Sequence, residues 1–237
     1  MKKFITLMIA CLFINTIIFG ELLEKQIEEK NQEEMLTFMQ LTAKYRFGND
    51  LKVGDKVTYK KLGVEGQHCS LEVIENNNQK LLIKEYFDNI TYYILWDSKT
   101  KEICDFYGYD EEKKLHKPEL LNEEKLADNL NEYRTHGFLD MLPKIIKSES
   151  ITTFQTREKS IPCSKYELEL SDDFKQEKSK EKIDQFLEKN SFYFSSEIPK
   201  MIPFTFVTLS FVNSLDLLTT DEGFVKNRSL ELADYSK

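Results

Sequence analysis

The chain lacks the sequence motifs of the common catalytic chemistries. None of the patterns GxSxG, HExxH or GxxxxGK[ST] occurs in its 237 residues, and its 8 glycines are too scattered to cradle a phosphate. The 3 histidines lie far apart, and the acidic pairs fall in charged runs that are typical of solvated surface. The sequence therefore predicts a protein that is not an enzyme and that uses no cofactor or metal.

Acidic residues outnumber basic ones, and cysteines are few. The chain has 33 lysines and arginines against 41 aspartates and glutamates, a net charge of −8. Such a surface repels nucleic acid and anionic lipid headgroups, so we expect no nucleic-acid partner. Cys69, Cys104 and Cys163 lack CxxC spacing, and their odd number leaves the pairing open. Each is interpreted as a small buried hydrophobe or as half of a disulfide.

Only one long apolar run is present, and it lies at the start of the chain. Lys2 and Lys3 precede apolar residues up to Phe19, and Gly20 is followed abruptly by charged residues. This layout predicts a signal peptide over residues 1–20 and export to the periplasm or cell envelope. An uncleaved N-terminal anchor and lipid attachment at Cys11 remain alternatives.

The rest of the chain predicts an N-terminal helix within residues 21–50, followed by one domain over 51–237. Residues 52–110 alternate between apolar and polar side chains in five segments with short polar turns, which predicts an antiparallel meander. Residues 119–148 have helical spacing, and the charged insert 172–190 is a helix or a solvated excursion. The predicted fold class is α+β: a curved antiparallel sheet, or half-barrel, with helices packed on its concave side.

The stretch 191–211, "SFYFSSEIPKMIPFTFVTLSF", reads as two apolar strands joined by a proline corner. Together with "VGDKVTYK", "IPCSKYELEL" and "LELADY", it resembles the half-open β-barrel family of bacterial periplasmic proteins. The type members of that family are the outer-membrane lipoprotein carriers LolA and LolB. The resemblance implies an apolar concave cavity that holds acyl chains beneath a helical lid, a lid that would correspond to residues 119–148.

The function expected from this reasoning is non-enzymatic binding of a hydrophobic ligand, a lipid acyl chain or a lipoprotein, in the half-barrel. The candidate lining consists of five aromatic residues: Trp96, Phe192, Phe194, Phe204 and Phe206. In the alternative, the same side chains fill the core. The protein would then be a structural or interaction protein of the periplasm, which contacts an envelope protein partner through its N-terminal helix or its charged insert.

Overall fold

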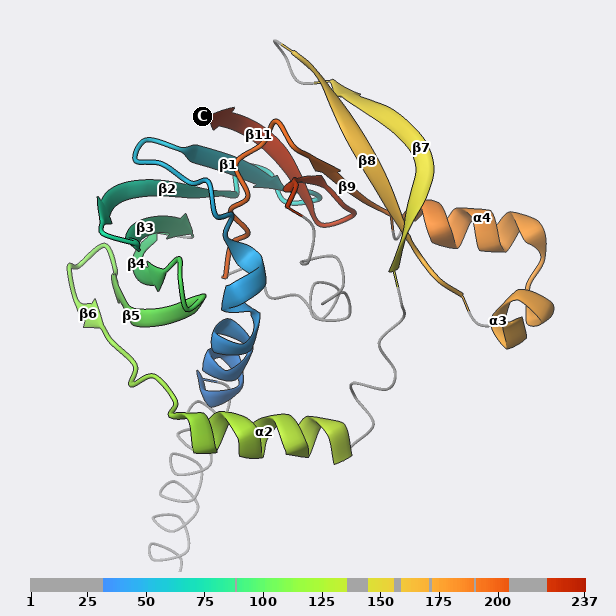
Figure 1. Ribbon diagram of the computed structural model, residues 1–237. Coiled ribbons are helices and arrows are strands. Elements are labelled where there is room, and N and C mark those ends of the chain that lie inside the picture. The colour runs from blue at the N-terminus through green and yellow to red at the C-terminus, as the bar shows by residue number, and fades with distance from the viewer. Residues whose placement is uncertain are drawn as a thin grey trace, which may run out of the picture.

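A single curved antiparallel sheet forms the body of the protein (Figure 1). The computed structural model describes residues 32–87, 89–135, 145–155, 159–170, 172–189, 191–204 and 221–237. The predicted signal peptide with Cys11, the front of the N-terminal helix and Phe206 all lie outside the described residues. In the part of the chain that is described, no helix is long and apolar enough to cross a membrane.

The sheet contains eleven strands within the described residues. They are β1 (Lys56–Lys61), β2 (His68–Asn77), β3 (Lys80–Phe87), β4 (Ile90–Asp97), β5 (Glu102–Tyr109), β6 (Leu115–His116), β7 (Ile145–Gln155), β8 (Ser160–Leu168), β9 (Phe192–Ser195), β10 (Gly223–Lys226) and β11 (Leu230–Ser236). Their order in the sheet is β6-β5-β4-β3-β2-β1-β11-β10-β9-β8-β7, so the sheet ends at β6 and β7 and does not close into a barrel. The predicted α+β fold with a curved antiparallel sheet is confirmed.

The predicted meander is confirmed as strands β1 to β5. In β2 the alternate residues Cys69, Leu71 and Val73 are fully buried, while the residues between them are partly exposed. The turn from β2 to β3 places Asn78 and Gln79 at φ angles of 48° and 90°. Two-residue hairpin turns need this left-handed backbone, because it matches the twist of the flanking strands.

The N-terminal helix covers residues 32–46 and lies on the concave side of the sheet (Figure 1). Its apolar positions Leu36, Met39 and Ala43 are buried in the core. Helix α2 (Glu123–Thr135) packs against it, and Asn129 Nδ2 donates a hydrogen bond of 2.8 Å to Thr37 Oγ1. The concave side is thus covered first by the N-terminal helix, with α2 behind it.

The segment 119–148 does not stay helical to its end, which corrects the prediction. Within the described residues only α2 is helical there, and residues 145–148 begin strand β7, where Ile145 pairs with Leu168 of β8. Two adjacent β-branched isoleucines favour the extended backbone. The charged insert 172–190 contains α3 (Asp172–Glu177) and α4 (Lys180–Lys189), so it is helical.

The aromatic stretch begins as predicted. In β9, Phe192 and Phe194 are buried, while Tyr193 between them faces the other side of the sheet. The second strand, expected to start at Pro203, is absent as far as Phe204, where the described residues stop. Residues 199–204 form an irregular segment, here called the strap, which contacts strands β1 and β3 through Tyr59 and Glu85.

Candidate functional site

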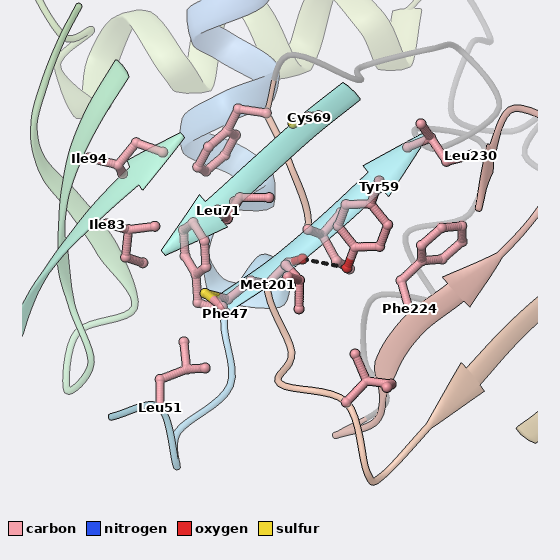
Figure 2. Close-up of a cluster of buried hydrophobic side chains, with 14 of the residues drawn as sticks. Phe47, Leu51, Tyr59, Cys69, Leu71, Ile83, Ile94, Met201, Phe224 and Leu230 are labelled. Carbon is pink, nitrogen blue, oxygen red and sulfur yellow. Dashed lines mark hydrogen bonds between the residues drawn. The ribbon is translucent and has the colours of Figure 1, made fainter. Parts of the chain in front are cut away.

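The strap is bound to the core through its backbone. Tyr59 donates its phenolic hydrogen to the Met201 carbonyl at 2.9 Å, as Figure 2 shows. The end of the N-terminal helix pairs with the strap from the other side, because the Lys200 carbonyl accepts a 2.9 Å bond from the Gly48 N–H. Ile202 N–H donates to the carbonyl of Arg46 at 3.0 Å. Buried backbone groups need such partners, so the strap is part of the folded core.

Two buried ionisable side chains tie down the last residues of the strap. Arg46, which is 1% exposed, donates from Nη1 to the Pro203 carbonyl and from Nε to Thr42 Oγ1 at 2.7 Å. The buried Glu85 accepts a 3.0 Å bond from Phe204 N–H. Burial lowers the pKa of Arg46 to about 10, against the opposing effect of the nearby Glu85 charge, so the guanidinium remains protonated at neutral pH.

The structure places the predicted lining residues in one hydrophobic core. Trp96, Phe192, Phe194 and Phe204 are all buried there; Phe206 lies outside the described residues. The ring of Phe47, at the end of the N-terminal helix, contacts both Trp96 and Phe204, with centroid distances of 5.4 and 5.5 Å.

At the other end of the core, Phe194 contacts Phe224 and Tyr166 at 5.7 and 5.3 Å. These neighbours are protein side chains, and helix, strap and sheet together occupy the concave side. Figure 2 shows the same arrangement around Phe47, Leu71 and Met201. In the described part of the chain, these side chains pack against one another on the concave side.

The convex face of the sheet carries a different feature, a row of polar side chains that crosses the strands. The register pairs His68 with Lys60, Lys60 with Glu231, Glu231 with Lys226, and Lys226 with Tyr193. Apart from Lys226, these residues alternate along their strands with buried core residues, so they face away from the core. In β10 the register shifts between Phe224 and Lys226, which sets Lys226 opposite Tyr193.

The centre of this row is an ion-pair triad. Glu231 contacts Lys60 on one side and lies 2.9 Å from Lys226 Nζ on the other. Partial burial raises the pKa of Glu231, but the hydrogen bonds and charges of the two lysines outweigh that effect, so its pKa is below the usual value. Two cations share one carboxylate, which leaves the triad with a net positive charge.

Phe154 of β7 lies over this row of side chains, with one cavity on each side of its ring. The two cavities together are here called the convex groove. One cavity of about 330 Å³ is lined by Phe154, Tyr193, Lys226, Asn227 and Arg228, among others. The second, of about 370 Å³, lies on the Lys60 side, and Phe154 lines it as well. The Lys226 ammonium is 5.9 Å from the centre of the Phe154 ring. Cavities of this size are within the usual range for small-molecule sites.

Strands β7 and β8 form a hairpin. It can reach over the row of polar side chains because its tip extends beyond the end of the neighbouring strand β9. Strand β8 pairs with β9 only over Ser164–Tyr166, while β7 and β8 continue together to Gln155 and Ser160. The side chains of Gln155 and Ser160 also hydrogen bond to each other. The two strands therefore leave the sheet as a pair and carry Phe154 over the convex face.

The turn between β10 and β11 adds donors to the groove. Asn227 is only 3% exposed; its Oδ1 accepts bonds of 2.8 Å from the N–H groups of Ser229 and Leu230. Its Nδ2 group has no hydrogen-bond partner among the described residues. Arg228 is exposed and, within the same residues, makes no ion pair. An amide donor and a guanidinium thus remain available beside the cavity.

The cysteines and the acidic residues form no further site in the described part of the chain. Cys69, Cys104 and Cys163 form no disulfide with one another in the described part of the chain. Cys69 and Cys163 are buried, and burial raises the pKa of the Cys163 thiol to about 11, while Cys104 is exposed. No group of His, Cys, Asp and Glu in the described residues is arranged to hold a metal ion.

Comparison with protein-family models, with curated proteins and with solved structures gave no match. Sequence reasoning did not find the convex groove, because its residues come from seven separate segments of the chain. A partial signal was available in the outward positions of the strands: a lysine in "TYKK", a glutamate in "LELA" and a basic pair in "FVKNR". Only the pairing of β11 with β1 brings them together.

Proposed function

We propose that this chain is a non-enzymatic binding protein of the cell envelope, in which the half-barrel is a filled scaffold and the convex groove holds the ligand. One observation carries the proposal: the strap and the N-terminal helix already lie on the concave face, where the strap is hydrogen bonded to the sheet and the end of the helix is hydrogen bonded to the strap. The convex groove has two cavities, and the buried Asn227 amide beside one of them has no hydrogen-bond partner in the described residues, as is also true of the Trp96 indole N–H in the core. The location in the envelope rests on the N-terminal sequence.

The acyl-chain carrier implied by the family resemblance is the second candidate. For an acyl chain to enter the concave face, residues 32–46 and the strap would have to leave it. That step would expose Phe47, Trp96 and Phe204 and break the hydrogen bonds of Arg46, a buried charged group. A buried group that loses its hydrogen-bond partner costs about 1–3 kcal/mol, and a charged group costs more. The filled scaffold is therefore the better supported of the two proposals.

Amide chemical-shift mapping tests this proposal. The full chain, produced with its own N-terminal segment and labelled with ¹⁵N, is titrated separately with a library of small polar molecules, with short peptides and with a short-chain lysophospholipid. Backbone amides of Thr153, Phe154, Tyr193 and Lys226 report on the convex groove, and those of Trp96 report on the concave core.

The proposal predicts saturable shifts at the groove amides for some members of the library, with Trp96 unchanged. Saturable shifts centred on Trp96 in the presence of lysophospholipid, without any ligand at the groove, would overturn it in favour of the carrier. A matched pair of variants makes the assignment firm. Phe154→Ala should abolish binding in the groove, and Leu115→Ala, which removes an exposed side chain of β6 outside it, should not.

A further inference from the structure

We infer that the cavity beside Arg228 binds a small organic anion, a molecule with a carboxylate or phosphate group on an apolar body; this inference rests on the proposed function. The cavity lies between the tip of the β7–β8 hairpin and the turn that joins β10 to β11. Its volume of about 330 Å³ suits a ligand of modest size. The proposal follows from the chemistry of its two kinds of wall.

The first wall consists of consecutive donors. Lys226, Asn227 and Arg228 all line the cavity. The ammonium of Lys226 shares Glu231 with Lys60, so its charge is only partly compensated. Arg228 has no ion-pair partner within the described residues, and a guanidinium presents a planar set of donors that fits a carboxylate or phosphate in bidentate geometry.

Asn227 is the independent sign that a ligand belongs here. Its side chain is held in one orientation, because Oδ1 accepts two backbone hydrogen bonds of 2.8 Å. In this orientation Nδ2 is buried and has no hydrogen-bond partner in the described part of the chain. A buried donor without an acceptor costs about 1–3 kcal/mol, and a bound molecule or an ordered water is one way to supply the missing acceptor. An anionic oxygen would supply the missing acceptor.

The second wall is apolar. Phe154 and Tyr193 line the same cavity, together with Leu62. Aromatic walls bind flat or apolar groups by dispersion and by excluding water. A free inorganic ion would use only the donors, whereas an aromatic or aliphatic acid would use both walls. The single acid in the cavity, Glu188, is exposed and belongs to α4.

The charge balance also favours an anion. Three cations, Lys60, Lys226 and Arg228, gather at the convex groove with two acids, Glu188 and Glu231. The chain as a whole has a charge of −8, so this local excess of positive charge runs against the average. An acidic surface around a small basic site repels large polyanions, while a small anion can still approach.

Titration with matched probes tests the inference on the full chain. Benzoate and phenyl phosphate carry both proposed features, acetate and inorganic phosphate lack the apolar body, and benzyl alcohol and benzylamine lack the anion. Affinities are read from amide shifts of residues 226–228 and from isothermal calorimetry at two salt concentrations. We expect benzoate or phenyl phosphate to bind most tightly and to weaken at the higher salt concentration.

Two substitutions and one control complete the experiment. Arg228→Gln should reduce the affinity for the preferred anion by roughly tenfold or more, and Phe154→Leu should reduce the advantage of benzoate over acetate. Lys56→Gln removes an exposed lysine of β1 that lines neither cavity, and it should change the affinity less than twofold. The relative affinities of benzoate and phenyl phosphate show whether the site prefers a carboxylate or a phosphate group.

The possible failures are distinguishable. If benzyl alcohol or benzylamine shifts the groove amides as strongly as benzoate does, the anion assignment is overturned and the convex groove remains a binding site. If inorganic phosphate binds as tightly as phenyl phosphate, the inference that the ligand has an apolar body is overturned. If no probe and no library member shifts these amides, the proposed function fails together with the inference.

Discussion

Replacing Arg46 by methionine should weaken the fold strongly, because Arg46 links the N-terminal helix to the strap. Methionine keeps an unbranched stem but is shorter, and it has no charge and no donor. The change leaves the Pro203 carbonyl and the Thr42 hydroxyl without the donors that now reach them, and it removes the positive charge with which Glu85 interacts. Removing one member of a buried charged pair costs about 3–5 kcal/mol.

The expected loss can be measured by urea unfolding of the full chain, followed by tryptophan fluorescence, since Trp96 lies in the affected core. For a chain of this size, 1 kcal/mol corresponds to about 2–4 °C in Tm, so the melting temperature should fall by roughly 6–20 °C. Arg228→Met is the matched control, because Arg228 is exposed, and it should cost less than about 0.5 kcal/mol.

A double substitution separates the charge from the packing. If Glu85 is destabilised mainly by the loss of its counter-charge, Glu85→Gln should restore part of the stability lost in Arg46→Met, so that the two effects are not additive. A loss below about 1 kcal/mol in Arg46→Met, equal to that of the control, would refute the view that the strap is fixed to the core by this side chain.

Three further predictions concern single positions. Gly223→Ala should destabilise the fold by about 1–3 kcal/mol, because a Cβ there would lie 2.4 Å from the Ile198 carbonyl oxygen, and Gly108→Ala should cost less, because its nearest neighbour is a side chain that can move. Asn227→Ala should cost about 2 kcal/mol, since two backbone N–H groups lose their acceptor. Relative to Lys200→Met, the wild type should gain stability between pH 8 and pH 10, because burial lowers the pKa of Lys200 to about 8.

The sign of the last effect follows from proton linkage. Above pH 8 the folded chain loses the Lys200 proton, while the unfolded chain keeps it up to about pH 10.5, so the unfolded state binds more protons and stability rises with pH. Asp221 opposes the shift and Lys101 supports it. Urea unfolding at several pH values measures all three predictions. The steric prediction is contradicted if the two glycine variants lose the same free energy of unfolding. The hydrogen-bond prediction is contradicted if Asn227→Ala leaves the stability unchanged. The linkage prediction is contradicted if the stability of the wild type and that of Lys200→Met change in parallel with pH.

Most of the strands could be predicted from the sequence, because the alternation of apolar and polar residues along a strand is a local signal. The first residues of β7, which were expected to be helical, and the short strand β10 were not predicted. Alternation in "HCSLEVIE" places Cys69 and Leu71 inward, and the same rule orients Phe192 and Phe194. The strap could not be predicted in the same way. Its path depends on contacts between residues far apart in the chain, such as the hydrogen bond from Arg46 to Pro203.

The convex groove also escaped prediction for a physical reason. Along one strand, an outward lysine such as Lys60 or Lys226 looks like ordinary solvated surface. It becomes part of a site only when the register sets both lysines against Glu231 and when the hairpin tip brings Phe154 over them. The choice between a hollow and a filled half-barrel was likewise a question of volume, and the packing of Phe47 against Trp96 and Phe204 supports the filled alternative.

The most direct test of the filled scaffold is organic-solvent extraction of the purified full chain followed by mass spectrometry for bound lipid. With the concave face occupied by the N-terminal helix and the strap, the account predicts no lipid in stoichiometric amount. Stoichiometric acyl-chain lipid that is lost on Phe204→Asp in a protein that remains folded would contradict it, and would show that the concave face is the binding site.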